Sequence, residues 1–284
     1  MKPSPFNYYR ADSVGNALAL LQEHGDDAQI LAGGQSLMAM MNLRLLAPEA
    51  LIDINSIKEL SGITQEDGVI RIGALTRHSE VEHSEVVAEH LPLLKMAIRH
   101  VGHAAIRNRG TLGGSISLAD PAAEMPACAV ALNAEIEVRG PSGTRRIAAD
   151  KFFHGLFETE LQADELLTAV CFPLATPEAH SAFNELARRH GDYALVGVAI
   201  HGPVIGGTYG ALRIVYFGVG DQAILASNAA QVLEGQSLTG ETLSRAQEAL
   251  DGDLDPSSDL HGSAEFKSHL ARVLLGRALK QLAE

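Results

Sequence analysis

Two glycine pairs, each followed within two residues by a serine, constrain the fold of this chain more than any other feature. The first lies in Ala32-Gly33-Gly34-Gln35-Ser36 and the second in Thr111-Leu112-Gly113-Gly114-Ser115. The first pair falls where an expected strand (28–34) meets an expected helix (36–45). Glycine lets the backbone turn and approach a ligand closely, and the N-terminus of a helix offers unpaired N–H donors. Each turn therefore suits one phosphate group, with an ordinary strand-to-helix turn as the alternative.

Taken together, the two turns suit a pyrophosphate, because such a group has two phosphates to hold. Neither turn contains lysine, which favours binding through backbone amides over a Walker-type loop. Arg107 and Arg109 precede the second turn, and we interpret them as solvated surface side chains, with a contribution to the site's charge as the alternative. Asp120-Pro121 predicts a helix start capped by Asp120, with a bond to a ribose hydroxyl as the alternative.

The pattern along the chain predicts three segments: residues 1–53, residues 54–175, and a third that starts near Leu174. Ser13 and Gly25 are the expected start and stop of a helix over 13–24. The other expected elements are strands at 50–55, 68–75 and 164–173, helices at 85–103 and 123–134, and a hairpin around Gly140-Pro141-Ser142-Gly143. Residues 175–180 are expected to be a linker. Two β-rich runs (193–205 and 210–220) then precede helices at 224–234, 239–250 and 263–283, an order that predicts an α+β domain.

Charge and composition exclude several classes of function. The formal net charge is −13, so nucleic-acid binding has little support. Two cysteines, Cys128 and Cys171, cannot supply the four ligands of an iron–sulfur cluster, and their apolar neighbours predict burial. No apolar run approaches the roughly 18 residues of a membrane span, and the N-terminus lacks the apolar region of a signal peptide, so we expect a cytoplasmic protein. Neither HExxH nor GxSxG occurs, and we predict no metal site and no catalytic residue in this chain.

The order of these motifs identifies a resemblance. AGGQS at 32–36, IRNRGTLGG at 106–114, ADPAAEMP at 119–126 and ARRHGDYALVGVA at 187–199 together resemble the FAD-binding medium subunit of molybdenum hydroxylases. This is the family of xanthine dehydrogenase and aerobic carbon monoxide dehydrogenase, and nicotine and caffeine dehydrogenases have similar medium subunits. The resemblance covers nearly the whole chain, and the combination of the first two motifs is far more specific than either alone.

The resemblance implies an α+β fold. Residues 1–175 would form an FAD domain of the vanillyl-alcohol oxidase type, with subdomains at about 1–53 and 54–175. Residues 177–284 would form the C-terminal domain of carbon monoxide dehydrogenase flavoproteins, with an antiparallel sheet and helices. Residues 32–36 and 111–115 would hold the FAD pyrophosphate. Glu124 would lie near the nucleotide, the backbone near Leu166 would border the adenine, and Tyr193 would lie against the isoalloxazine ring.

The implied function is electron transfer within a complex. A large subunit would carry the molybdenum cofactor, a small subunit would carry two 2Fe–2S clusters, and FAD in this chain would pass electrons to an external acceptor. The implied assembly is a dimer of heterotrimers. The alternatives are a self-contained FAD oxidoreductase and a scaffold subunit without FAD. Two positions depart from the family pattern. Ser115 replaces a common asparagine, and Phe183-Asn184-Glu185 lacks a lysine that many relatives carry.

Overall fold

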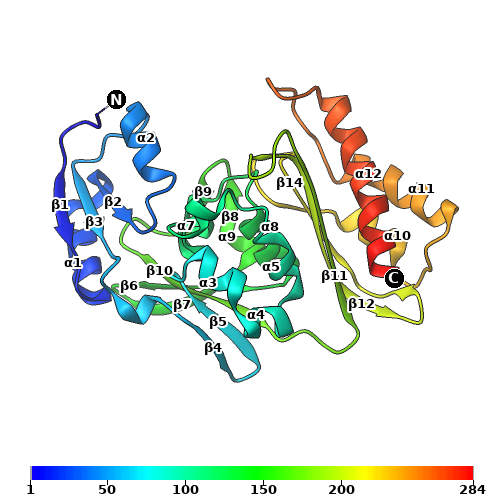
Figure 1. The fold of residues 1–284 in the computed structure, drawn as a ribbon, viewed down its shortest axis with the longest axis horizontal. Coiled ribbons are helices and arrows are strands. Elements are labelled where there is room, and N and C mark those ends of the chain that lie inside the picture. The colour runs from blue at the N-terminus through cyan, green and yellow to red at the C-terminus, as the bar shows by residue number, and fades with distance from the viewer. Residues whose placement is uncertain (1, 284) are drawn as a thin grey trace.

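The computed structural model describes residues 2–283, which form three parts arranged along the long axis of the molecule (Figure 1). Each part is built on its own β-sheet: a small parallel sheet at the N-terminus, an antiparallel sheet in the middle and a second antiparallel sheet near the C-terminus. Helices pack on all three sheets, so the expected α+β class is confirmed. No helix within residues 2–283 is both long enough and apolar enough to cross a bilayer.

The N-terminal part is a three-stranded parallel sheet in the order β1-β3-β2, with α1 packed against β3. Ser13 caps α1 by accepting a hydrogen bond from the Asn16 N–H, and Gly25 ends the helix with a φ of 54°, as predicted. Its elements are β1 (Asn7–Arg10), α1 (Val14–His24), β2 (Ala28–Leu31), α2 (Leu37–Leu43) and β3 (Ala50–Asp53).

The central part holds a five-stranded sheet in the order β4-β5-β10-β6-β7 and a small β8–β9 pair. The predicted hairpin is β6–β7, which turns at Gly140–Gly143. The elements are β4 (Ile63–Glu66), β5 (Val69–Gly73), α3 (His78–His83), α4 (Glu85–His90), α5 (Pro92–Ala97), α6 (Ala104–Arg107), α7 (Leu112–Leu118), α8 (Glu124–Ala131), β6 (Glu135–Gly140), β7 (Gly143–Ala148), α9 (Ala149–Phe152), β8 (Phe153–Gly155), β9 (Glu158–Thr159) and β10 (Leu166–Pro173).

The C-terminal part has the strand order β11-β12-β14-β15, with β13 paired to β12. Helix α12 covers one face of this sheet, while α5 and α8 of the central part contact the other. The central and C-terminal parts therefore share one hydrophobic core. The elements are β11 (Ala179–Ala187), β12 (Ala194–Ile205), β13 (Thr208–Tyr209), β14 (Arg213–Phe217), β15 (Ile224–Leu225), α10 (Ser227–Leu233), α11 (Gly240–Ala249) and α12 (Ala264–Ala283).

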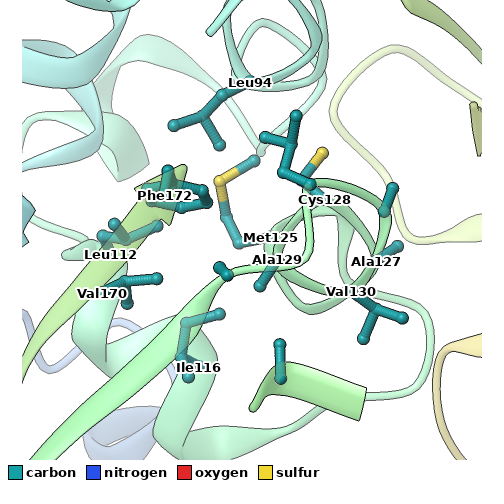
Figure 2. Packing of buried hydrophobic residues seen from close by; sticks show 14 of the residues in the cluster. Leu94, Leu112, Ile116, Met125, Ala127, Cys128, Ala129, Val130, Val170 and Phe172 are labelled. Atoms are coloured by element: carbon teal, nitrogen blue, oxygen red, sulfur yellow. The ribbon is translucent and has the colours of Figure 1, made fainter. Parts of the chain in front are cut away.

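Helix α8 is the centre of this shared core. All eight of its residues are buried, and Figure 2 shows Met125 and Cys128 of α8 among side chains of α5, α7 and β10. Cys171 of β10 is buried as well, so the predicted burial of both cysteines is confirmed. Burial raises the pKa of both thiols, most strongly that of Cys128, and therefore keeps them protonated at neutral pH.

Two expected elements differ from the structure. Residues 85–103 do not form one helix: α4 ends at His90 and α5 begins at Pro92, where the missing proline N–H has no cost because the first N–H groups of a helix are unpaired. The expected linker at 175–180 is two residues too long, because β11 begins at Ala179 and pairs with β12 from Ala179 to Ala187. The polar residues of β11 hid this strand, since they interrupt the alternation that predicts one.

Gly197 of β12 gives space to the ring of Phe217, its partner on β14. A Cβ at position 197 would lie 2.0 Å from the Phe217 Cζ atom. We expect Gly197→Ala to lower the free energy of unfolding by about 1–3 kcal/mol through overpacking. Chemical denaturation of the variant measures this. Gly240→Ala is the control because a Cβ there meets no atom within 4 Å, and Gly197→Ala combined with Phe217→Leu should recover part of the loss.

Candidate cofactor site

A cavity of about 640 Å³ is lined by all three parts of the chain. The N-terminal part contributes the turn between β2 and α2, the central part contributes α7 and the start of α8, and the C-terminal part contributes residues 191–193. The predicted site residues that line this cavity are Ala32, Gly33, Gly34, Gln35, Ser36, Thr111, Gly113, Gly114, Ser115, Glu124, Leu166 and Tyr193. The fold thus brings into one cavity predicted site residues that are up to 161 positions apart in the sequence, from Ala32 to Tyr193.

The two glycine turns lie directly against each other. A Cβ on Gly33 would lie 2.4 Å from the Arg109 carbonyl oxygen and 2.9 Å from the Gly110 Cα, so only glycine permits this approach. Gly34 has a φ of 71°, in the left-handed region that favours glycine. Within the described residues, the N–H groups of Gly33 through Ser36 find no hydrogen-bond acceptor in the protein. The first turn therefore has amide donors available for a ligand.

The second turn differs from the first in how its amides are used. The Gly113 N–H donates to the Ala74 carbonyl (2.9 Å), and the Gly114 N–H donates to the Thr111 hydroxyl (3.1 Å). A Cβ on Gly113 would lie 2.6 Å from the Ala74 Cβ, so this glycine allows α7 to pack closely on the central sheet. Leu112 is the one predicted site residue outside the cavity lining, since its side chain is buried in the core shown in Figure 2.

A side-chain bridge that the sequence analysis missed ties the two turns together. The Asn55 amide donates to the Ala32 carbonyl (2.8 Å) and accepts from the Arg77 guanidinium (2.7 Å). The same guanidinium donates to the Arg109 carbonyl. Arg77 and Asn55 thus connect the backbone of the first turn to that of the second. No short motif marks either residue, because the bridge forms only between segments that the fold brings together.

His78 is a second residue that the sequence analysis missed. It lines the cavity, and its Nε2 lies 3.1 Å from the Ser115 hydroxyl, while its buried Nδ1 has no partner within the described residues. Burial, reinforced by the charges of Arg107 and Arg77, lowers the pKa of His78 to about 4. His78 is therefore neutral at physiological pH, and the hydroxyl of Ser115 pairs with its ring.

The lowered pKa of His78 predicts a loss of stability in acid. The unfolded chain takes up a proton on this ring below about pH 6.5, whereas the folded chain does so only near pH 4. The free energy of unfolding should therefore fall as the pH falls between those values, by on the order of 3 kcal/mol in total. We expect His78→Gln to lack this component when unfolding is measured across that pH range. His83→Gln, an exposed histidine on the same helix, should behave like the wild type.

Two carboxyl groups, Asp120 and Glu124, line the cavity near the start of α8. The sequence predicted that Asp120 caps this helix, and that prediction is wrong. The Asp120 carboxylate accepts a hydrogen bond from the Ala122 N–H in a turn, and the helix begins only at Glu124. Burial raises the pKa of Asp120, and burial together with the nearby Asp120 raises the pKa of Glu124 to about 7. Both shifts favour the neutral carboxyl, which lessens repulsion of an anionic ligand.

The arginines before the second turn have different environments. Arg107 is not a solvated side chain, because it forms a partly buried ion pair with Glu82 (2.8 Å) and donates to the Gly102 carbonyl (2.9 Å). Arg109 is exposed and takes part in the site through its carbonyl group. Neither side chain lines the cavity.

The two remaining predicted residues line the cavity but differ in burial. Leu166, at the start of β10, is buried, whereas the Tyr193 residue is 66% exposed. Gly191 has a φ of 79° and packs against Gly102. A Cβ on Gly191 would lie 2.9 Å from the carbonyl carbon of Gly102. This contact holds the loop that carries Tyr193 against the central part.

The fold and site define a class of protein: an oxidoreductase subunit whose FAD-binding domain precedes a C-terminal α+β domain. Residues 4–175 match the family described as "FAD binding domain in molybdopterin dehydrogenase", and residues 181–282 match "CO dehydrogenase flavoprotein C-terminal domain". The chain belongs to the family of medium, FAD-binding subunits of molybdenum hydroxylases.

Relatives of known identity resemble the chain over nearly its full length. The alpha subunit of the 6-hydroxypseudooxynicotine dehydrogenase complex of Paenarthrobacter nicotinovorans is 39% identical, over 98% of this chain and 95% of that protein. The structure of carbon monoxide dehydrogenase from Hydrogenophaga pseudoflava matches with a TM-score of 0.97 and 38% identity, over 99% of this chain and 98% of that one. Quinoline 2-oxidoreductase from Pseudomonas putida 86 matches with a TM-score of 0.94 and 37% identity, over 100% and 98%.

Proposed function

We propose that this chain is the electron-transfer flavoprotein subunit of a molybdenum-containing hydroxylase. FAD bound here accepts electrons from the 2Fe–2S clusters of a partner subunit and passes them to an external acceptor. The observation that carries the proposal is the contact of Gly33 with Arg109 and Gly110, which brings the two glycine turns into one cavity. The relative from Paenarthrobacter nicotinovorans is a subunit of a dehydrogenase complex, and this supports the same role here.

The residues of the cavity fit FAD by their chemistry. The available amides of Gly33 through Ser36 are donors for a pyrophosphate, and Thr111 through Ser115 form the opposing wall. With FAD bound, Glu124 and Leu166 would lie on the nucleotide side of the site, and Tyr193 would lie against the isoalloxazine ring. When bound, FAD supplies the chemistry by exchanging electrons singly or in pairs, while the protein positions it and tunes its electrostatics.

The proposed partners are those that the family resemblance implies: a small subunit with the 2Fe–2S clusters and a large subunit with the molybdenum cofactor, in a dimer of heterotrimers. The two cysteines of this chain are both buried and cannot hold an iron–sulfur cluster, which agrees with clusters on a partner. Within this chain, residues 1–53 and 54–175 form the two FAD subdomains, and residues 177–284 form the domain that completes the site with Tyr193.

Affinity purification through a tag on this chain tests the proposal. We expect companion chains that carry molybdenum and iron–sulfur clusters, together with FAD in a one-to-one ratio to this chain. FAD in the complex should be reduced by the substrate of the large subunit, and the isolated chain should not be. Reduction of the isolated chain by that substrate would favour a self-contained oxidoreductase, and an intact complex without flavin would favour a scaffold.

A further inference from the structure

The second glycine turn has little backbone to offer a ligand. The N–H groups of residues 112–115 all donate within the protein, in order to the carbonyls of Thr76 and Ala74 and then to the hydroxyl and the carbonyl of Thr111. Within the described residues, only the Thr111 N–H of this turn lacks an acceptor, whereas the amides of residues 33–36 all lack one. Any further hydrogen bond from the second turn to an anion must therefore come from a side chain.

Ser115 carries the side-chain donor that a ligand can reach. Two residues of the second turn, Thr111 and Ser115, line the cavity and bear hydroxyl groups. Thr111 is 2% exposed, and its hydroxyl caps α7 by accepting from the Gly114 N–H. Ser115 is half-buried, and among residues 2–283 its hydroxyl has one hydrogen-bond partner, the Nε2 atom of His78 at 3.1 Å. What Ser115 offers the cavity therefore depends on His78.

The ring of His78 is held against the second turn. The residue is 3% exposed, and its backbone N–H donates to the Gly110 carbonyl (3.0 Å). A Cβ on Gly110 would lie 2.8 Å from the His78 Cδ2 atom, so the backbone of Gly110 packs directly on the ring. The ring Nδ1 is buried, and no partner for it exists within the part of the chain that the structure describes. The ring therefore has little room to rotate and one hydroxyl to pair with.

The position of the ring proton decides what the Ser115 hydroxyl offers. The lowered pKa of His78 leaves the ring neutral at physiological pH, so only one ring nitrogen carries a proton. With the proton on Nδ1, Nε2 accepts the hydroxyl proton, and Ser115 turns only lone pairs toward the cavity. With the proton on Nε2, the ring donates to the Ser115 oxygen, and the hydroxyl proton is free to point into the cavity.

Two features favour the proton on Nε2. A proton on Nδ1 would be a buried donor without an acceptor, and the positive charges of Arg107 and Arg77, which act on this ring, disfavour an unpaired N–H more than an unpaired lone pair. A phosphate group also presents only acceptor oxygens, so it is repelled by the lone pairs of a hydroxyl and attracted by its proton. Both features direct the Ser115 proton toward the ligand.

We propose that His78 is a positioning residue that donates from Nε2 and thereby fixes the Ser115 hydroxyl as a hydrogen-bond donor to the pyrophosphate. The inference rests on the proposed function, because the pyrophosphate belongs to FAD. The chain of hydrogen bonds runs from the His78 Nε2 to the Ser115 Oγ and from there to a phosphate oxygen. The two turns then contribute different donors: backbone amides of residues 33–36 from the first turn, and a side-chain hydroxyl from the second.

Fluorescence titration of the full-length apoprotein with FAD tests the donor. We expect Ser115→Ala to raise the Kd about tenfold, the effect of one lost hydrogen bond to a charged group, and His78→Leu to raise it similarly. The two losses should not add in the double variant, since both residues belong to one chain of hydrogen bonds. His78→Gln places an amide N–H near the position of Nε2 and should recover most of the affinity. His83→Leu, at an exposed position on the same helix, is the matched control.

NMR of the FAD-bound chain with nitrogen-15 in its histidines locates the ring proton directly. The His78 signals are those that His78→Gln removes, and we expect them to show the proton on Nε2. If His78→Leu does not fold, Ser115→Ala and this spectrum still decide. The inference is overturned by a proton on Nδ1, by a wild-type Kd in Ser115→Ala, by losses that add in the double variant, or by His78→Gln binding no better than His78→Leu. A wild-type chain that binds no FAD would instead contradict the proposed function.

Discussion

A chain carrying Gly33→Val should be purified with less than about a tenth of the FAD found in the wild type, a loss of at least about 1.4 kcal/mol in binding. The valine Cβ would overlap the Arg109 carbonyl oxygen and the Gly110 Cα, which are backbone atoms and cannot rotate away. The two glycine turns would therefore separate, and the amides of the first turn would move out of reach of the pyrophosphate. Flavin absorbance per chain after purification measures the effect.

Two further variants show whether this loss comes from the site or from unfolding. Gly15→Val alters a helical glycine whose Cβ would meet no atom within 4 Å, and it should retain FAD. Gly113→Val would strike Ala74 of the central part and should lower both the FAD content and the melting temperature. A Gly33→Val chain that keeps its full complement of FAD would contradict our assignment of the pyrophosphate site.

The second large effect concerns Arg77, which bridges the two turns. We expect Arg77→Ala to raise the Kd for FAD about tenfold to a hundredfold, because it removes charge-assisted hydrogen bonds to both Asn55 and the Arg109 carbonyl. Arg77→Lys should rescue little, since one ammonium group cannot replace the forked donors of a guanidinium. Fluorescence titration of the apoprotein with FAD provides the measurement.

Arg245→Ala is the matched control for Arg77, because Arg245 is exposed on α11 of the C-terminal part. Asn55→Ala should weaken FAD binding in the same direction as Arg77→Ala. The two losses should not add in the double variant, since both residues belong to one bridge. An Arg77→Ala chain with wild-type affinity would show that packing of Gly33 alone holds the turns together.

Local patterns were sufficient for many elements of the fold. Ser13 and Gly25 mark the ends of α1, and Gly140–Gly143 mark the β6–β7 hairpin, because capping and turn geometry depend on neighbouring residues. Where distant contacts decide, the same patterns were not sufficient. β11 carries polar residues, yet it forms a strand because it pairs with β12 along its length and packs between α12 and α5.

The amino-acid sequence by itself determined which two segments turn at paired glycines, since the glycines at positions 33 and 113 are local properties of the chain. Only the tertiary structure decided how the two turns differ. The first turn keeps free amides and the second packs closely on the central sheet, while Asn55 and Arg77 join the two by hydrogen bonds. It also decided that the buried carboxyl group of Glu185 lies beside His100. These arrangements depend on the distance between residues far apart in sequence, and that distance is set only when the core has packed.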